Sequence, residues 1–315
     1  VANCLYWMSR YLERADNTAR LVDVNLQLLL DQRSRDPETL AGYWMPIVQS
    51  AGDEALYRSL FTDASAANVT DFLVFHPANP NSILGAITQS RENARMVRDQ
   101  ITIELWEELN RLYLFLHTPR ATKLLRSSPV EFFQEVRAAS LHLQGLVDAT
   151  ILHNEGWHFL QAGKFLERAD KTARILDVKY FILLPNPSHV GSQVDVVQWG
   201  ALLESTSALQ MYRRTFGRIQ PVNVVDFLML NAQFPRSMRF CVGAAEKSLM
   251  EICGTDDSDS APLREVRSLG SQLTNAKASE IIEGGLHQFV DNYQSHLNDI
   301  GQAISETFFQ VATPV

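Results

Sequence analysis

The amino-acid sequence predicts an all-α protein, a duplicated helical bundle whose two pseudo-twofold-related halves share one core. Apolar residues recur at helical spacing through almost the whole chain, and no alternating apolar–polar run is flanked by hairpin turns. A block of fourteen residues also occurs twice. The chain has 315 residues, of which 46% are hydrophobic and 20% are charged, a composition typical of globular proteins.

The first helix is predicted by five residues with an amphipathic spacing, Leu12, Ala15, Ala19, Val22 and Leu26. Similar patterns predict helices within five further stretches: 80–116, 129–184, 193–215, 235–253 and 280–309. Clusters of proline, glycine and aspartate are expected to separate the helices. These clusters are Asp36-Pro37, His76 to Pro80, Thr118-Pro119, Pro185-Asn186-Pro187, Ile219 to Pro221 and Gly254 to Pro262.

The repeat is the most informative feature of the sequence. Residues 11–24 read YLERADNTARLVDV and residues 165–178 read FLERADKTARILDV, with ten of the fourteen positions identical. Further matches follow 155 positions apart: Trp44 with Trp199, Tyr57-Arg58 with Tyr212-Arg213, Asp71-Phe72-Leu73 with Asp226-Phe227-Leu228, and Pro80-x-Ser82 with Pro235-x-Ser237. The register predicts two helical repeats, 1–152 and 153–315, in one compact unit.

Each copy of the repeat carries a stripe of charged residues along one side of its helix. The stripes consist of Glu13, Asp16, Arg20 and Asp23 in the first copy and of Glu167, Asp170, Arg174 and Asp177 in the second. Paired alanines beside each stripe predict that the two helices pack closely together. One interpretation is a set of ordinary ion pairs on the helix surface, in which Arg20 pairs with Asp16 or Asp23, Arg10 pairs with Glu13, and Lys164 pairs with Glu167. The others are a polar site at the seam, with Glu13 and Glu167 as acid–base or cation-binding groups, and a surface that recognises a partner.

A second group of charged residues occurs only in the first half. Arg91, Arg95 and Arg98 share one side of a helix, with Asn93 between them. Three guanidinium groups in a row can hold a phosphate or a carboxylate. The alternative is that they neutralise the acidic stripes. The aligned stretch of the second half, 246–248, lacks these arginines, so the sequence predicts at most one such site.

Other features restrict the function. The net charge of −8 argues against a general nucleic-acid binder. Three sparse cysteines, without metal-ligand spacing, are expected to be reduced. No apolar run is long enough to span a membrane, and the expected location is the cytoplasm. The Glu155-x-x-His158 pair lacks the second copy that a di-iron bundle needs, so neither a metal nor another cofactor is expected. Nucleotide-binding glycine loops and the GxSxG motif are absent from the sequence.

Four blocks of the sequence resemble the bacterial alpha-E family. They are residues 1–20 (VANCLYWMSRYLERADNTAR), residues 91–98 (RENARMVR), Asn154-Glu155-Gly156-Trp157 leading to residues 165–169 (FLERA), and Phe234-Pro235-Arg236-Ser237. The blocks span most of the chain and are specific in combination. Ser9 stands where the family often has glycine, as Gly163 does in the second copy. The motif positions that transfer are Glu13, Arg14, Glu167, Arg168, Arg91, Glu92, Asn93, Arg95 and Arg98.

The resemblance implies a cytosolic, wholly helical protein that works with other proteins. Alpha-E genes tend to neighbour genes for circularly permuted ATP-grasp enzymes, transglutaminase-like proteins and proteasome-like peptidases. This neighbourhood implies a system that makes, modifies or degrades peptide-like amide bonds. We therefore expect an accessory or binding subunit that recognises an ATP-grasp-type ligase, or an anionic or peptide-like ligand. The alternative is an enzyme that acts on a peptide-like or phosphorylated substrate through a carboxylate and arginine site between the repeats.

Overall fold

The computed structural model describes residues 1–31, 44–183, 193–254 and 259–310, and every regular element in these ranges is a helix. The helices up to residue 150 are α1 (Ala2–Asp31), α3 (Met45–Ala51), α4 (Glu54–Leu60), α5 (Ala66–Val74), α6 (Ile83–Met96), α7 (Ile103–Leu116), α8 (Pro119–Ser127) and α9 (Pro129–Thr150). The all-α prediction is confirmed.

The later helices begin with a second long one. They are α10 (Glu155–Leu183), α11 (Gln193–Ser205), α12 (Leu209–Phe216), α13 (Pro221–Val225), the π-helical turn η2 (Asp226–Leu230), α14 (Met238–Cys253), α15 (Ala261–Asn275), α16 (Ala278–Gly284), α17 (Leu286–Ile304) and the π-helical turn η3 (Ser305–Phe309).

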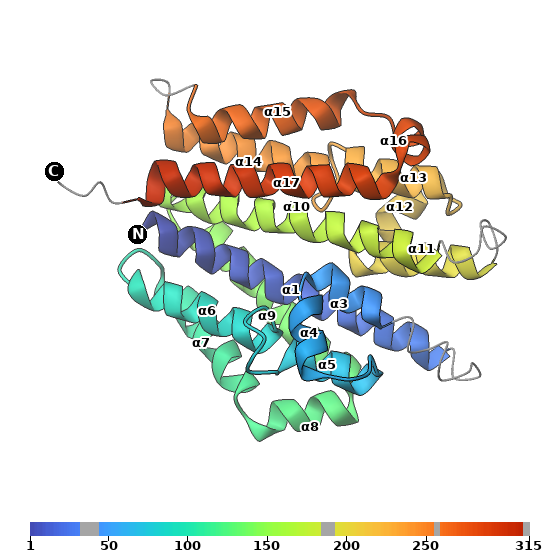
Figure 1. Cartoon of the computed structure of the whole chain (residues 1–315). Coiled ribbons are helices and arrows are strands. Elements are labelled where there is room, and N and C mark those ends of the chain that lie inside the picture. Colours follow the sequence, from blue (N-terminus) through green and yellow to red (C-terminus); the bar gives the residue numbers. More distant parts are fainter. Residues whose placement is uncertain (32–43, 184–192, 255–258, 311–315) are drawn as a thin grey trace.

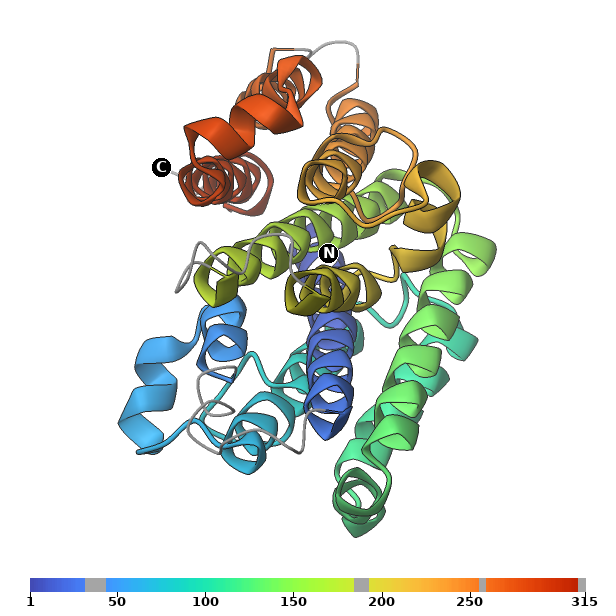
Figure 2. The ribbon, with the colours of Figure 1, turned by 90° about the vertical axis from the view of Figure 1, so that its right-hand side faces the viewer.

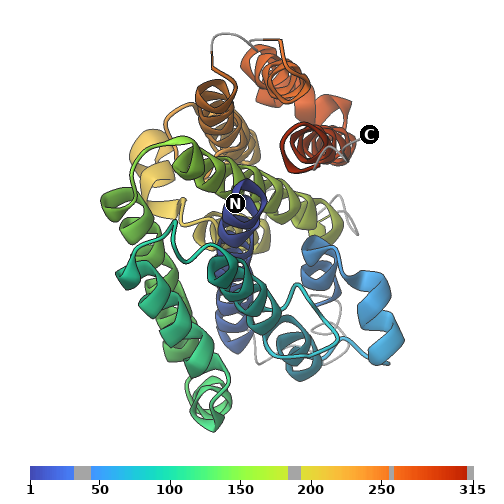
Figure 3. The same ribbon diagram turned by 90° about the vertical axis from the view of Figure 1, so that its left-hand side faces the viewer.

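The two long helices that carry the repeated sequence, α1 and α10, lie side by side through the middle of the molecule (Figure 1). Helices α6 and α9 pack on α1, and α14 and α17 pack on α10. Seen from either end, the helices of residues 45–150 lie on one side of α10 and those of residues 238–304 lie on the other (Figure 2, Figure 3). Helix α3 packs on α10, whereas α11 packs on α1, so each long helix also receives a helix from the other part of the chain.

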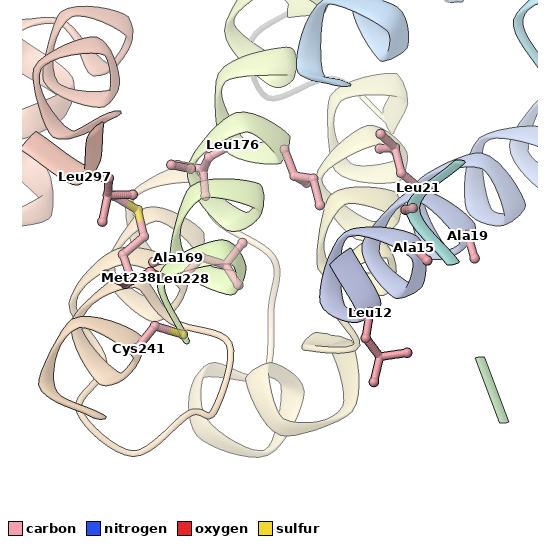
Figure 4. Packing of buried hydrophobic residues seen from close by; sticks show 14 of the residues in the cluster. Leu12, Ala15, Ala19, Leu21, Ala169, Leu176, Leu228, Met238, Cys241 and Leu297 are labelled. Atoms are coloured by element: carbon pink, nitrogen blue, oxygen red, sulfur yellow. The ribbon is translucent and has the colours of Figure 1, made fainter. Parts of the chain in front are cut away.

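The close approach of α1 and α10 depends on one small residue. A Cβ atom on Gly163 would lie 2.4 Å from the main-chain oxygen of Tyr6, a distance that no side chain can occupy. Beside it, the Ser9 hydroxyl donates a hydrogen bond of 2.6 Å to the main-chain oxygen of Leu160. The predicted alanines are fully buried, and Ala15, Ala19 and Ala169 appear among the core side chains in Figure 4.

Two local structures occur in the same form in both parts of the chain. Ser82 begins α6 by accepting a hydrogen bond from the amide of Gly85 at 3.0 Å, and Ser237 begins α14 by accepting one from Phe240 at 3.1 Å. Such serine caps satisfy an amide that the helix leaves without a partner. The buried Tyr57 and Tyr212 likewise each donate a hydrogen bond to a main-chain oxygen six residues later, at 2.7 and 3.0 Å.

Two of the predicted helical stretches contain breaks that the proline, glycine and aspartate clusters did not predict. The 80–116 stretch is interrupted between Met96 and Ile103, where Thr102 begins α7, and the 129–184 stretch is interrupted between Thr150 and Glu155. Neither break contains proline or glycine, so the apolar spacing gave no stop signal there. The breaks predicted at Asp36-Pro37 and at Pro185 to Pro187 lie outside the described residues. Cys4, Cys241 and Cys253 are free thiols, as expected.

Candidate functional site

Glu13 lies at the centre of a buried polar cluster between α1 and α10. Its side chain is 1% exposed. Arg168 binds both carboxylate oxygens, each at 2.8 Å, in the forked geometry that suits a guanidinium and a carboxylate. Arg236 of the loop before α14 donates a third hydrogen bond at 2.9 Å. Gln144 of α9 and Asn17 of α1 donate two more, both at 3.0 Å.

Arg236 extends this cluster along α1 to Asp16. Its second terminal nitrogen lies 2.7 Å from Asp16 Oδ2, and Arg20 Nε lies 2.9 Å from the same oxygen. Arg20 also donates to the hydroxyl of Ser207, in the turn between α11 and α12. Asp16 is fully buried and Arg20 is 4% exposed. Four separate segments of the chain therefore meet at the acidic stripe of α1.

Glu167 is the centre of a second cluster on the other side of the same helix pair. Arg14 Nε and Arg10 Nε donate to its two oxygens at 2.7 and 2.9 Å. Lys171 Nζ lies 3.8 Å from Glu167 and 3.5 Å from Asp170. Arg14 also donates to Asn81 at 2.6 Å. The arginine that follows each glutamate in the sequence, Arg14 or Arg168, thus binds the glutamate of the other helix.

The two clusters hold both glutamates in the ionised form. Burial acts to raise the pKa of Glu13, but Arg168 and Arg236 outweigh it and keep the pKa well below its usual value. Burial has the same effect on Glu167, where Arg14, Arg10 and Lys171 lower the pKa. Burial also lowers the pKa of Lys171, against the attraction of Asp170 and Glu167.

Two cavities beside the clusters are too small for a substrate. One cavity of about 20 Å³ lies beside Arg14, Asn17 and Lys171, and another of about 20 Å³ lies beside Glu13, Gln144 and others. A volume of this size holds about one water molecule. In the part of the chain that the structure describes, the seam between the two repeated helices is a closed network of ion pairs rather than an open cleft.

The predicted site residues lie together, but in buried ion pairs, some of them between helices, rather than in the surface ion pairs within one helix that were one interpretation of the sequence. The pair of Asp16 and Arg20 is present, as is that of Asp170 and Arg174 at 2.8 Å. The expectation that the stripes lie on the surface is wrong, because the carboxylates are buried or nearly so. The two glutamates face arginines of the other long helix, whereas Asp16 faces Arg236 of the loop before α14. Asp23 binds Arg137 of α9 at 3.2 Å rather than Arg20. The partners expected for the glutamates within one helix, Arg10 for Glu13 and Lys164 for Glu167, bind Glu167 and Asp148 instead.

The arginines of α6 form a separate surface. Arg91 hydrogen-bonds to Asn110 and Glu92, both at 2.8 Å, and its guanidinium lies over the rings of Trp106 and Tyr113. Arg95 binds Glu92 at 2.8 Å and is 58% exposed. The alternative that these arginines neutralise the acidic stripes is wrong, because their ion pairs are formed with Glu92 of their own helix.

Arg98 lies in the turn after α6 and stacks on Trp106 of α7, with its guanidinium carbon 4.6 Å from the ring centre. We call this surface, formed by Arg91, Arg95, Arg98 and Trp106, the α6 arginine surface. Asn93 does not belong to it, because at about 100° per residue it lies on the opposite side of α6 from Arg91 and Arg95, where it donates to the main-chain oxygen of Gln89 at 2.8 Å.

Sequence reasoning did not identify Arg236, Gln144 and Lys171 as members of the buried clusters, and it assigned Arg10 to Glu13 rather than to Glu167. A signal for Arg236 was present in the repeated Pro-x-Ser motif, whose middle residue is Asn81 in one copy and Arg236 in the other. Asn81 and Arg236 each contact one of the clusters. They differ between the two copies, whereas the proline and the serine on either side are identical. Glu155 and His158 do not belong to any group of three or more potential metal ligands among the described residues.

Comparison with known proteins identifies a family that is described by the same Glu-Arg motif. Residues 1–309 match the model of the Alpha-E family, described as a predicted alpha-helical domain with a conserved ER motif. The Glu-Arg pair occurs twice in this chain, at Glu13-Arg14 and Glu167-Arg168. Uncharacterized proteins of Mycobacterium bovis and Mycobacterium tuberculosis are each 25% identical over 342 residues, covering 100% of this chain and 37% of their own length. The chain thus spans less than two fifths of these relatives. No solved structure matches it.

Proposed function

The chain belongs to the Alpha-E family, and from that premise we propose that it is a cytoplasmic, non-catalytic binding subunit of a peptide-modification system. It works beside an ATP-grasp-type ligase that forms amide bonds, and it recognises the ligase or an anionic, peptide-like ligand. The observation that carries the proposal is the closed seam between α1 and α10, where each glutamate is bound by two arginines.

A closed seam favours binding over catalysis at these glutamates. A general acid must hold a proton near neutral pH, and a general base needs a pKa close to the working pH. The arginines lower the pKa of Glu13 and of Glu167 instead, so both carboxylates are ionised and weakly basic. Their hydrogen bonds connect separate helices, which is the arrangement of a rigid scaffold.

The α6 arginine surface supplies the proposed recognition. Arg95 is exposed and its partner Glu92 is 40% exposed, so a carboxylate or phosphate from solution can replace Glu92 with little rearrangement. Trp106 and Tyr113 hold Arg91 in place from one side. This combination of forked donors with aromatic rings suits an anionic peptide-like group.

The length of the relatives supports a role beside another folded protein. In the mycobacterial relatives the aligned region makes up 37% of the chain. The Alpha-E unit therefore occurs there as one part of a longer polypeptide. We propose that the Alpha-E unit acts beside another folded part, in the same polypeptide or in a partner protein.

We also propose that the chain is a duplicated unit, with halves 1–152 and 153–315 related by a pseudo-twofold axis. Support comes from the exchanged ion pairs, in which Arg168 binds Glu13 and Arg14 binds Glu167. The matching serine caps of α6 and α14 point the same way, as do the crossed contacts of α3 with α10 and of α11 with α1.

The proposal is tested by binding measurements between the purified chain and purified ATP-grasp, transglutaminase-like and proteasome-like proteins from one genome. We expect a complex with the ATP-grasp ligase, and we expect Arg95→Glu combined with Arg98→Glu to weaken it by roughly tenfold or more. Arg111→Glu is the control, because Arg111 is 50% exposed on the neighbouring helix α7 but lies outside the α6 arginine surface. The absence of any complex, or equal weakening by the control, contradicts the proposal.

A further inference from the structure

A second polar group connects α10 to α17, away from the glutamate clusters. His287, in the first turn of α17, contacts Asp177 of α10 through its Nδ1 atom at 2.7 Å. Its Nε2 atom lies 3.4 Å from Asp291, one turn further along α17. One ligand atom from each of the three residues lies within 4.8 Å of the others. The side chains of Asp177, His287 and Asp291 are 15%, 33% and 51% exposed, so a small ion can reach them from solution.

The corresponding contact in the first part of the chain has the opposite charge pattern. Helix α9 packs on α1 as α17 packs on α10, and their buried residues fall 154 positions apart: Phe132 with Leu286, Val136 with Val290, Ala139 with Tyr293, and Leu143 with Leu297. In this register Asp23 corresponds to Asp177, and Arg137 corresponds to Asp291. Asp23 and Arg137 form an ion pair at 3.2 Å.

The contact of α10 with α17 therefore brings two carboxylates together, whereas the contact of α1 with α9 pairs a carboxylate with an arginine. His287 stands where the first contact has the buried Phe133. Two aspartates at such close range repel each other unless a positive charge lies between them. The ring of His287 lies between the two carboxylates and contacts both. A divalent cation bound among the three side chains neutralises both carboxylates and uses one imidazole nitrogen as a ligand.

We propose that Asp177, His287 and Asp291 form a binding site for one Zn²⁺ ion. One imidazole nitrogen and two carboxylate oxygens are a common ligand set for Zn²⁺, whereas Ca²⁺ and Mg²⁺ prefer oxygen ligands alone. Three protein ligands leave a fourth position for water or for a group from a partner molecule. Asp177 contacts Nδ1 and Asp291 contacts Nε2, so an ion bound by one nitrogen at about 2.0 to 2.1 Å requires the other carboxylate to move to that edge of the ring. The bound ion fastens the start of α17 to α10.

The test is a titration of the metal-free full chain with Zn²⁺ alone, followed by calorimetry in the presence of a competing chelator. The wild type is expected to bind one equivalent. His287→Ala is expected to weaken binding at least tenfold, because it removes the nitrogen ligand. Asp291→Arg is the sharper variant, since it copies the charge pattern of Asp23 and Arg137. We expect it to stay folded, with an unchanged circular dichroism spectrum, and to lose Zn²⁺ binding.

The control is His142→Ala, which removes a histidine that is 61% exposed and lies 3.5 Å from a single carboxylate, that of Glu108. This variant is expected to bind Zn²⁺ as the wild type does. The proposal is overturned if the wild type shows no saturable binding, or if His287→Ala and Asp291→Arg bind Zn²⁺ as tightly as the wild type. Equal loss in His142→Ala also overturns it, because the ion then binds to surface histidines in general.

Discussion

Glu13 and Glu167 occupy matching positions in the repeated block of α1 and α10, but their surroundings differ in exposure. The arginines that bind Glu13, Arg168 and Arg236, are 7% and 9% exposed. The cations around Glu167 are more accessible, at 19% for Arg10, 15% for Arg14 and 13% for Lys171.

The difference follows from one residue of the Pro-x-Ser loop. Arg236 reaches Glu13 and Asp16 together, whereas Asn81 at the matching position binds Arg14 and Asp53. Helix α10 holds Arg236 in place, because the hydroxyl of Thr172 donates a hydrogen bond of 2.9 Å to the main-chain oxygen of Arg236. The Pro-x-Ser motif thus lies beside a buried cluster around Glu13 and beside a partly solvated cluster around Glu167. Its middle residue, Arg236 or Asn81, accounts for the difference.

The largest expected effect separates the two glutamates directly. Glu13→Gln leaves the buried Arg168 without its counter-charge and leaves Arg236 with Asp16 alone, and we expect it to lower the free energy of unfolding by about 3 to 5 kcal/mol. Glu167→Gln is expected to cost roughly 2 kcal/mol, because Arg10 and Arg14 can turn toward water. Urea unfolding followed by circular dichroism measures both values. Equal losses in the two variants would show that the difference in exposure has no energetic consequence.

The crossing point of α1 and α10 gives the next comparison. Gly163→Ala places a methyl group against the main-chain oxygen of Tyr6 and is expected to cost about 1 to 3 kcal/mol through overpacking. At the matching position of α1, Ser9→Gly removes a hydrogen bond and is expected to cost about 1 kcal/mol. Thermal unfolding of the two variants gives the order. A Gly163→Ala protein as stable as the wild type contradicts the close approach.

Acid is expected to weaken both clusters. The pKa of each glutamate is lower in the folded chain than in the unfolded chain, where it is about 4.3. The stabilisation is therefore complete above the unfolded value and is lost as the pH falls from about 4.3 toward the folded value. Each carboxyl contributes a slope of up to about 1.4 kcal/mol per pH unit. Unfolding measured between pH 6 and pH 3 should give a shallower acid dependence for Glu13→Gln, and an unchanged slope would argue against ionised Glu13.

The smallest expected effect on stability lies on the α6 arginine surface. Arg95→Ala removes an exposed ion pair with Glu92 and is expected to change the free energy of unfolding by less than about 0.5 kcal/mol. The same variant is expected to weaken binding of the ligase. A large loss of stability would instead assign Arg95 a structural role, which a urea unfolding curve can establish.

Much of the helical architecture could be predicted from periodicity and from the repeat. The stretch around Leu12, Ala15 and Ala19 is helical and buried, and the break at Thr118-Pro119 begins α8. The breaks after Met96 and Thr150 were missed because no proline or glycine marks them. The chain instead ends one helix and begins the next at Thr102 and Asn154, residue types that also occur within helices.

The candidate site was predicted in its residues but not in its pairing. Spacing along one helix identifies neighbours three or four residues apart, so it identified Asp16 with Arg20 and Asp170 with Arg174. The same rule assigned Glu13 to Arg10, whereas Glu13 binds Arg168. That contact depends on how two helices cross, and the periodicity of one helix contains no information about the angle. Arg236 was missed for the same reason, because it reaches α1 from a loop.

The Glu13 cluster has a consequence for the order in which the chain folds during synthesis. Arg236 lies 223 residues after Glu13 in the chain. At about 5 to 20 residues per second, roughly 11 to 45 s pass between the synthesis of the two residues. During that interval α1 carries a carboxylate that cannot be buried without its arginines. Helix α1 is therefore among the last of the described helices to reach its final packing, and the nascent chain must keep the acidic side of α1 in water until α14 begins.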